Sequence, residues 1–442
     1  MEIFDIAVIG AGSAGCALAG RLAEQTDLRI ALIEGGADYG RRTSGRWPAD
    51  LLDAHYTPDS HDWGFDQSRA RVIGGCSVHN ECALVRALPG DYSRWDIPGW
   101  SDADLAPIVA DVAGRIPTQI CRDEELATWQ HAFLDTAIDA GFSRSDVSPF
   151  TQNIKNGIRW NAAFAFLDPV RSKVKVISNI LVDRLIIERD RAEVLIGHGP
   201  NGPIEVRAER FVLCAGVYGS PAILLRSGIG LRGIGANLHD HPGVALEYQP
   251  TRQALRAVKT DAATGRFYQA QVALKKEPDL RIVPYQTKED GEWSFSILAY
   301  YLSPRSRGRM RIKSRDPAEP PSIDLGLLDD ARDVAPLVDA VQIVHELTRQ
   351  SPLAEAIKSG PRRFTSRKRL ASFVRENVTD YAHAVGTCRM GDVIDAHGRV
   401  EGLSNVFVAD ASIIPQIPRA NTNFTCFVIG MRVADFLRTA RP

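Results

Sequence analysis

The N-terminal segment places a glycine-rich turn between two apolar runs, and this arrangement constrains the fold more than any other feature. Residues 5–9 form a short apolar run, residues 16–25 have the composition of a helix, and residues 29–33 form a second apolar run. The turn between the first run and the helix reads GAGSAG, with glycines in the spacing GxGxxG. This order of segments predicts a βαβ unit of about 30 residues.

Each glycine of this turn has its own role in dinucleotide binding. Gly10 permits a tight turn, Gly12 lets the backbone approach a pyrophosphate, and Gly15 allows the helix to pack closely on the strand. The pyrophosphate then lies at a helix N-terminus, where free N–H groups favour anions. Glu34 follows the second strand and can accept hydrogen bonds from ribose hydroxyls. These residues predict a dinucleotide, and they do not separate NAD from FAD.

Coarse patterns predict the remaining elements. We expect a long ordered loop at 37–75, and such a loop in a compact domain is usually functional. The patterns favour paired strands at 174–196, a strand at 211–215 and further strands within 245–325, where the basic run 305–315 is interpreted as a strand pair with a solvated face. Helices are expected within 101–150 and at 221–226, 337–348 and 427–439.

Several further blocks follow one another along the chain. Residues 71–80 read RVIGGCSVHN, residues 219–230 read GSPAILLRSGIG, and residues 235–242 read GANLHDHP. Residues 381–390 read YAHAVGTCRM and residues 408–415 read VADASIIP. Together with the first motif, these blocks resemble the glucose–methanol–choline (GMC) family of FAD-dependent oxidoreductases, in the family's order from the first strand to the last helix.

The resemblance implies an α/β fold with two lobes. One lobe would be a Rossmann-type FAD-binding domain like that of glucose oxidase, and the other a sheet-based α+β substrate domain. The FAD-binding domain would be discontinuous, with residues 1–150 together with 160–240 and 381–442. Residues 241–380, with part of 85–160, would form the substrate-binding domain.

Position by position, the resemblance also implies the cofactor site. Val182 matches a backbone contact to adenine, and Asp410 and Ala411 match the phosphate and ribityl end. The implied FAD contacts are Gly10, Gly12, Ser13, Ala14, Gly15, Glu34, Gly35, Arg71, Gly74, Gly75, Ser77, His79, Asn80, Cys82, Ala83, Val182, Ala215, Asp410, Ala411, Asn421, Thr422 and Asn423.

Two residues match the family's catalytic pair. His383 lies in the HxxGT block, and Asn421 precedes the last helix. An alcohol cannot readily lose hydride while its O–H proton remains, and an imidazole can take that proton as hydride moves to flavin N5. An amide is no base, so Asn421 would orient the hydroxyl and stabilise the developing alkoxide. The resemblance therefore implies oxidation of an alcohol to an aldehyde or ketone, with reoxidation by O2 or another acceptor.

His79 stands where choline-oxidase-like members carry a histidine bonded covalently to the flavin 8α-methyl group. The surrounding string GGCSVHNEC is close to that subgroup. Covalent FAD through His79 is therefore predicted, and the alternative is a noncovalent histidine near the ring.

Other functions remain as alternatives. A non-redox lyase on the same scaffold, as in the family's hydroxynitrile lyases, would use the histidine for proton chemistry alone. A light-driven decarboxylase is disfavoured because His383 is present, and an NAD-dependent dehydrogenase leaves the C-terminal blocks unexplained. His239, Asp240 and His241 look like metal ligands, but adjacent residues usually point in different directions. We interpret them as a structural turn and predict no metal.

Composition excludes some classes of partner. Lys+Arg is 53 and Asp+Glu is 54, so the net charge of -1 does not fit a strongly basic nucleic-acid binder. No apolar run approaches the ~18 residues of a membrane span, and the N-terminus lacks a secretory signal pattern. The seven cysteines form no CxxC pair, which disfavours a zinc site and favours a reducing cytoplasm. The expected partner is a small-molecule alcohol, with its identity and the oligomeric state left open.

Overall fold

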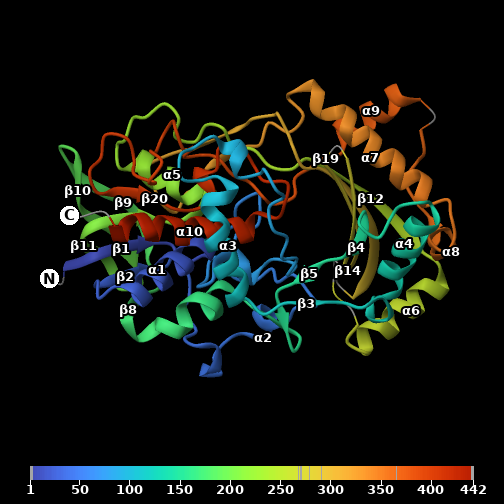
Figure 1. The fold of residues 1–442 in the computed structure, drawn as a ribbon, viewed down its shortest axis with the longest axis horizontal. Helices are drawn as coiled ribbons and strands as arrows, with labels where there is room; N and C mark the ends of the chain where they lie inside the picture. Colours follow the sequence, from blue (N-terminus) through green and yellow to red (C-terminus); the bar gives the residue numbers. More distant parts are fainter. Residues whose placement is uncertain are drawn as a thin grey trace.

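Two β-sheets, each packed against its own helices, divide the molecule into two lobes (Figure 1). The computed structural model describes residues 3–266, 268, 271–277, 279–289, 291–364 and 366–439. The predicted lobes also include residues outside this set, at 1–2, 267, 269–270, 278, 290, 365 and 440–442. Both termini lie in the first lobe, at the left of Figure 1.

The first sheet is built on the predicted βαβ unit, in which α1 (Ser13–Gln25) connects two parallel strands. Parallel pairing continues on both sides of that unit, and a β-hairpin completes the sheet at one edge. The strands, in spatial order, are β8 (Val174–Ile177), β2 (Ile30–Ile33), β1 (Ile3–Ile9), β11 (Gly202–Leu213), β10 (Arg191–Gly199) and β9 (Leu181–Glu188), with β20 (Val406–Val408) beside β11.

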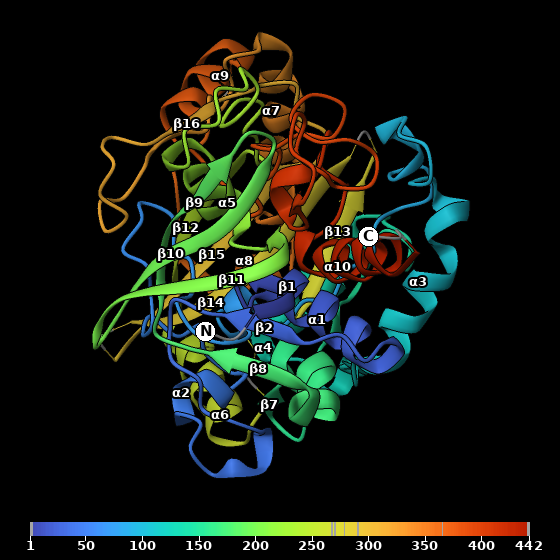
Figure 2. The same cartoon turned by 90° about the vertical axis from the view of Figure 1, so that its left-hand side faces the viewer.

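Helices from distant parts of the chain pack on this sheet. The last helix, α10 (Thr422–Thr439), lies beside α1 in the view of Figure 2, and α3 (Asp102–Arg115) packs against α10. On the hairpin side, α5 (Gly216–Arg226) contacts β9. The helix predicted at 427–439 begins five residues earlier, because the polar start of α10 hides its first turn from an apolar pattern.

The second sheet is antiparallel and alternates strictly between two faces. Val244, Leu246 and Ile297 pack into a core with the helices, whereas Ala245 and Leu298 point the opposite way. Its strands, in spatial order, are β18 (Ile357–Ser359), β12 (Gly243–Pro250), β15 (Glu292–Tyr301), β14 (Leu280–Glu289), β13 (Val272–Lys276) and β4 (Val147–Pro149), with β19 (Val378–Thr379) beside β12.

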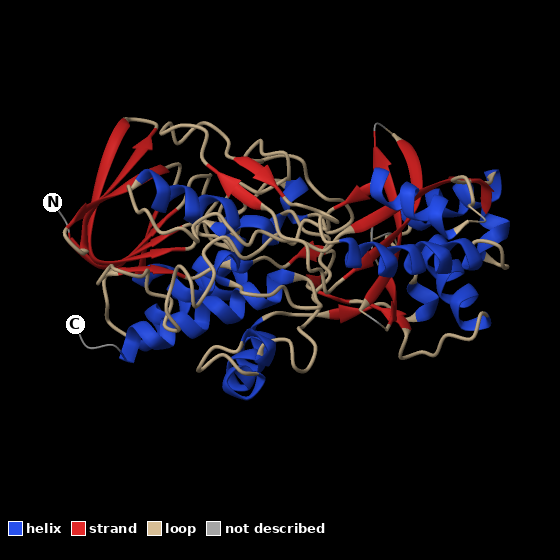
Figure 3. Cartoon of the chain, turned by 90° about the horizontal axis from the view of Figure 1, so that it is seen from above, coloured by secondary structure: helices blue, strands red, loops and turns tan. Residues whose placement is uncertain are grey.

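Helices cover the outer side of the second sheet, at the right of Figure 3. One of them, α6, lies in the region for which the sequence predicts strands. The helices are α4 (Thr128–Asp139), α6 (Arg252–Ala263), α7 (Val334–Leu347), α8 (Leu353–Ala356) and α9 (Arg367–Glu376).

Shorter elements lie outside the two large sheets. The loop predicted at 37–75 is largely irregular, and the basic run 305–315 contributes one strand of a two-stranded ribbon. The short elements are α2 (Ala49–Leu52), β3 (Gln119–Ile120), β5 (Thr151–Gln152), β6 (Ile154–Lys155), β7 (Ile158–Arg159), β16 (Arg309–Arg311) and β17 (Ser322–Asp324). No helix among the described residues is both long and apolar enough to span a bilayer.

The α1–α10 contact depends on the absence of a side chain at Gly430. A Cβ atom there would lie 2.3 Å from the carbonyl oxygen of Ala14. We expect Gly430→Ala to destabilise the protein by ~1–3 kcal/mol, because the helices must separate. Gly114→Ala, in α3, meets no atom within 4 Å. This control should stabilise by ~0.5–1 kcal/mol. Thermal unfolding measures both, and equal midpoint shifts would contradict this packing argument.

Candidate active site

A cavity of about 920 Å³ lies between the lobes and takes its lining from both. The carboxyl ends of four parallel strands face it, through Gly10 after β1, Glu34 after β2, Ala215 after β11 and Asp410 after β20. This is the edge at which open α/β sheets bind their ligands. The inner face of the second sheet forms the opposite wall.

Most of the predicted cofactor residues line this cavity, whereas four lie behind its wall. Gly15, Gly74, Ser77 and Cys82 do not line it. Ser77 Oγ instead donates to the Gly74 carbonyl at 2.6 Å, which holds the loop from behind. The predicted residues that line the cavity are Gly10, Gly12, Ser13, Ala14, Glu34, Gly35, Arg71, Gly75, His79, Asn80, Ala83, Val182, Ala215, Asp410, Ala411, Asn421, Thr422 and Asn423.

The glycines of the first motif test whether this cavity fits a dinucleotide. Gly10 has φ +101°, and a Cβ at Gly15 would lie 1.9 Å from the Gly10 carbonyl oxygen, so the fold itself requires both glycines. At Gly12 a Cβ would meet only Gly75 Cα, at 3.8 Å. The fold therefore leaves room for a side chain at Gly12, and the bare backbone there fits the approach of a pyrophosphate.

Glu34 and Arg71 form one end of the cavity. The Glu34 carboxylate accepts from the N–H groups of Ala11 and Gly36, both at 2.8 Å. Burial raises the pKa of Glu34, and these two N–H groups oppose that shift. The Arg71 guanidinium lies 4.8 Å from the Trp63 ring centroid and donates to the Gly35 carbonyl at 3.1 Å. Trp63, which the sequence did not single out, belongs to the loop predicted to be functional.

His79 is buried in the cavity wall, with 6% of its surface exposed. Neither ring nitrogen has a hydrogen-bond partner of regular geometry among the described residues, although the Ser60 backbone favours the protonated ring. Burial is the larger effect and lowers the pKa of His79. A buried polar group without a partner costs about 1–3 kcal/mol, so this neutral imidazole is suited to a ligand in the cavity.

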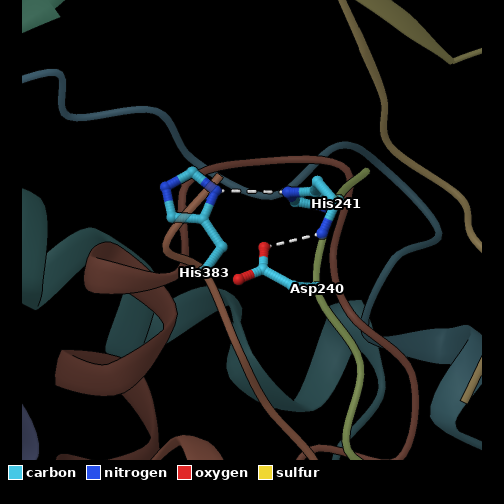
Figure 4. Close-up of side chains that lie close together, drawn as sticks. All are labelled: Asp240, His241 and His383. Carbon is cyan, nitrogen blue, oxygen red and sulfur yellow. Dashed lines mark hydrogen bonds between the residues drawn. The ribbon is translucent and has the colours of Figure 1, made fainter. Parts of the chain in front are cut away.

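The two predicted catalytic residues are in direct contact. Asn421 Nδ2 and His383 Nε2 lie 3.1 Å apart, and both residues line the cavity. The other ring nitrogen of His383, Nδ1, lies 3.2 Å from Nδ1 of His241, which follows Asp240 in the turn before β12 (Figure 4). The sequence predicted only a structural turn at His241, and the structure places its ring against the predicted catalytic histidine.

The hydrogen bonds assign a direction to this chain of side chains. His241 Nε2 lies 3.1 Å from the Pro418 carbonyl, which only accepts, so Nε2 of His241 must donate. Burial and Arg281 lower the pKa of His241 to about 3, so its ring is neutral and its Nδ1 accepts. His383 therefore donates from Nδ1 and keeps an acceptor lone pair on Nε2.

The other end of the chain agrees with this assignment. Arg281, on β14, donates to Asn421 Oδ1 at 2.9 Å, which leaves the Asn421 amide N–H groups to point at His383. Burial lowers the pKa of His383 well below its usual range, and the positive charge of Arg281 lowers it further. His383 is thus a neutral base with a fixed tautomer. No pattern in the sequence marks Arg281, because a basic residue in a strand carries no local signal of burial.

Asp240, His241 and His383 also lie close enough together to suggest a metal site, with ligand atoms within 4.8 Å of one another. Hydrogen bonds explain this geometry. The imidazoles of His241 and His383 form a hydrogen bond with each other, and the Asp240 carboxyl group accepts from the backbone N–H of His241 at 2.7 Å. Burial and Asp380 raise the pKa of Asp240 to about 8, so the carboxyl group is largely protonated at neutral pH and is a poor metal ligand.

Comparisons with known proteins agree with this geometry. The chain is 29% identical to the oxygen-dependent choline dehydrogenase of Serratia proteamaculans, and the alignment covers 99% of this chain and 96% of the relative. The enzyme of the same name from Citrobacter koseri is 28% identical, with the same coverage. The Serratia alignment extends over 539 positions, more than the 442 residues of the chain, so the relative contains segments that this chain lacks.

Solved structures share the fold along the whole chain. Pyridoxine 4-oxidase from Mesorbium loti superposes with a TM-score of 0.86 and 25% identity, covering 99% of this chain and 100% of that one. A formate oxidase from Aspergillus oryzae RIB40 reaches 0.85 with 18% identity, covering 99% and 98%. Family models described as GMC oxidoreductase match residues 4–243 and 304–430, well over half of the chain. The predicted fold class is confirmed, and the chain belongs to the GMC oxidoreductase family.

Proposed function

We propose that the protein binds FAD between its lobes and oxidises a small alcohol to an aldehyde or ketone, with His383 as the general base. The observation that carries this proposal is the hydrogen-bond chain that fixes a lone pair on His383 Nε2 beside Asn421 in the cavity. Bound FAD supplies the hydride acceptor, so the chain's own residues must remove the hydroxyl proton.

Asn421 and His383 divide the work on the hydroxyl group. A substrate hydroxyl that displaces this direct contact donates to His383 Nε2 and accepts from Asn421 Nδ2, which then stabilises the developing alkoxide. Arg281 holds Asn421 in this orientation through Oδ1. The relatives and solved structures named above are dehydrogenases and oxidases, which favours oxidation over the lyase alternative.

The proposed division into domains follows the two cores. The FAD-binding domain comprises residues 1–150 with 160–240 and 381–442, and the substrate-binding domain comprises 241–380 with part of 85–160. Side chains from 121–147 pack into the second core, which supports the crossover of this segment. All seven cysteines are free, as expected in the reducing cytoplasm proposed for this protein. The electron acceptor is O2 or another oxidant.

The direct test is an anaerobic titration of the purified yellow protein with amino, aryl, sugar and pyridoxine-like alcohols. Loss of the flavin absorbance band with one of them establishes oxidation and the class of alcohol. Reopening the sample to air then distinguishes O2 from another acceptor. A band that no alcohol bleaches would contradict the proposed function.

His383→Ala should keep the FAD and slow flavin reduction by ~10²-fold or more, because it removes the imidazole that hydrogen bonds with Asn421 in the cavity. His198→Ala, at an exposed position on β10, is the control and should reduce normally. The lowered pKa keeps His383 neutral at pH 7, so the wild-type rate should fall only well below pH 6.5. Stopped-flow absorbance measures both effects, and a normal rate in His383→Ala would remove the proposed base.

His241→Phe should lower kcat by ~10–100-fold with little change in KM, because His383 loses the acceptor that fixes its tautomer. His241 is neutral and accepts from His383 Nδ1, a hydrogen bond that is stronger when His383 is protonated, so its loss should move the acid limb of the pH profile to lower pH. His241→Gln, whose amide oxygen can accept from His383 Nδ1, should recover part of the rate. A pH profile identical to that of the wild type would show that His241 is only structural.

His79 tests the covalent form of FAD binding. Acid precipitation of the wild type should leave a yellow pellet, whereas His79→Ala should release its flavin to the supernatant. Cys76 lines the same part of the cavity, so Cys76→Ser is the matched control and should keep a yellow pellet. A colourless wild-type pellet would limit His79 to a noncovalent contact.

A further inference from the structure

The guanidinium of Arg281 must itself be held in place if it is to orient Asn421. Arg281 donates to Asn421 Oδ1 at 2.9 Å, whereas its contact with the Arg419 carbonyl is long, at 3.4 Å. The Nε group of Arg281 has no hydrogen-bond partner among the described residues. A further hydrogen bond joins Arg281 to the side chain of Tyr381, two residues before His383. The position of Arg281 therefore depends on the Tyr381 hydroxyl group.

A second tyrosine and an acid continue this row of hydrogen bonds. Tyr381 also hydrogen bonds with Tyr285, which lies on β14 together with Arg281. Tyr285 in turn hydrogen bonds with Glu81, and both residues line the cavity. Burial raises the pKa of Tyr381 and raises that of Tyr285 well above its usual range, so both phenols keep their protons at neutral pH. These four residues form a relay of hydrogen bonds that ends at Glu81.

The two ends of the relay set the direction of its hydrogen bonds. A guanidinium only donates, so the Tyr381 oxygen accepts from Arg281. An ionised carboxylate only accepts, so Tyr285 donates its one hydroxyl proton to Glu81, and Tyr381 must donate to Tyr285. Burial raises the pKa of Glu81 to about 7, but a protonated carboxyl group keeps a carbonyl oxygen that accepts from Tyr285. The same bonds therefore form in both states of Glu81.

Hydrogen bonds on either side of Glu81 hold it from behind the cavity wall. The Nε group of Arg159, a fully buried residue, donates to the Asn80 carbonyl at 2.9 Å. The Asn80 side-chain oxygen accepts from the Cys82 N–H at 3.1 Å. The backbone is thus fixed before and after Glu81, so its carboxyl group is a well-placed end point for the relay.

We infer that Glu81 is a positioning residue, the terminal acceptor of a relay that holds Arg281 against Asn421. This inference rests on the proposed alcohol oxidation, in which Arg281 orients Asn421. Without the acceptor, the Tyr285 hydroxyl is free to rotate, and the hydrogen bonds back to Arg281 lose their fixed direction. A small shift of the guanidinium then moves Asn421 away from the substrate hydroxyl, and such misplacement of a distant support slows a reaction strongly.

Glu81→Leu should slow anaerobic flavin reduction at saturating alcohol by ~10-fold, with little change in the apparent Kd of the alcohol, because the relay loses its acceptor. Glu81→Gln keeps an amide oxygen that accepts from Tyr285 and should restore most of the rate. The alcohol is the one that reduces the wild type in the titration above, and stopped-flow absorbance measures the rate. Equal rates of wild type and Glu81→Leu, or equal losses in the two variants, would overturn the role of Glu81 as an acceptor.

A double variant tests whether Glu81 acts through Arg281. In an Arg281→Met background, which already lacks the guanidinium, Glu81→Leu should cause no further loss of rate, because residues that act through one contact are not additive. Full additivity of the two substitutions would overturn the relay while leaving alcohol oxidation intact. Reduction of the wild type by no alcohol would instead contradict the proposed function itself.

Tyr285→Phe keeps the test open if Glu81→Leu does not fold. Loss of the middle hydroxyl should also slow flavin reduction by ~10-fold, because it interrupts the relay between Arg281 and Glu81. Tyr301→Phe, which removes a hydroxyl at the end of β15 and outside the cavity lining, is the matched control and should reduce normally. A normal rate in Tyr285→Phe, or an equal loss in Tyr301→Phe, would contradict the relay.

Discussion

The hydrogen bond between Asn421 and His383 lies where four parts of the chain, far apart in sequence, meet. Asn421 directly precedes the last helix of the first lobe, and His383 belongs to the segment that returns from the second sheet. Arg281 on β14 and His241 before β12 hold the two residues from either side. This arrangement of side chains therefore requires that both lobes are folded and packed against each other.

Arg281 gives this arrangement its electrostatic character. Its side chain is buried, and the described hydrogen bonds lead to Asn421, the Arg419 carbonyl and Tyr381, none of which neutralises its charge. The same positive charge that lowers the pKa of His383 also stabilises negative charge on a nearby alkoxide. The lower basicity of His383 is thus compensated by a lower pKa of the substrate hydroxyl, which lies near the same positive charge.

The sequence predicted those features that local patterns specify. The βαβ unit and its glycines depend on residues close together in the chain, and the structure places them as expected. The pairing of β12, β14 and β15 depends on long-range contacts, so the inward positions of Tyr285 and Tyr300 had no signal before the register was known. The burial of Arg281 and the contact between His241 and His383 depend on the same pairing. For this reason the sequence predicted the two catalytic residues through a resemblance, and missed the groups that orient them.

The turn at residues 79–82 carries two residues that line the cavity, His79 and Glu81. Cys82 has φ +64°, a conformation that few side chains adopt, and the side-chain oxygen of Asn80 accepts from its N–H at 3.1 Å. Because of this bend, the Cys82 side chain packs in a small core with Ala54, whereas Glu81 lines the cavity. The same short segment begins at His79, the predicted link to FAD. The predicted attachment of FAD at His79 and the position of Glu81 at the cavity depend on the same short segment, so a change that relaxes the bend at Cys82 should disturb both.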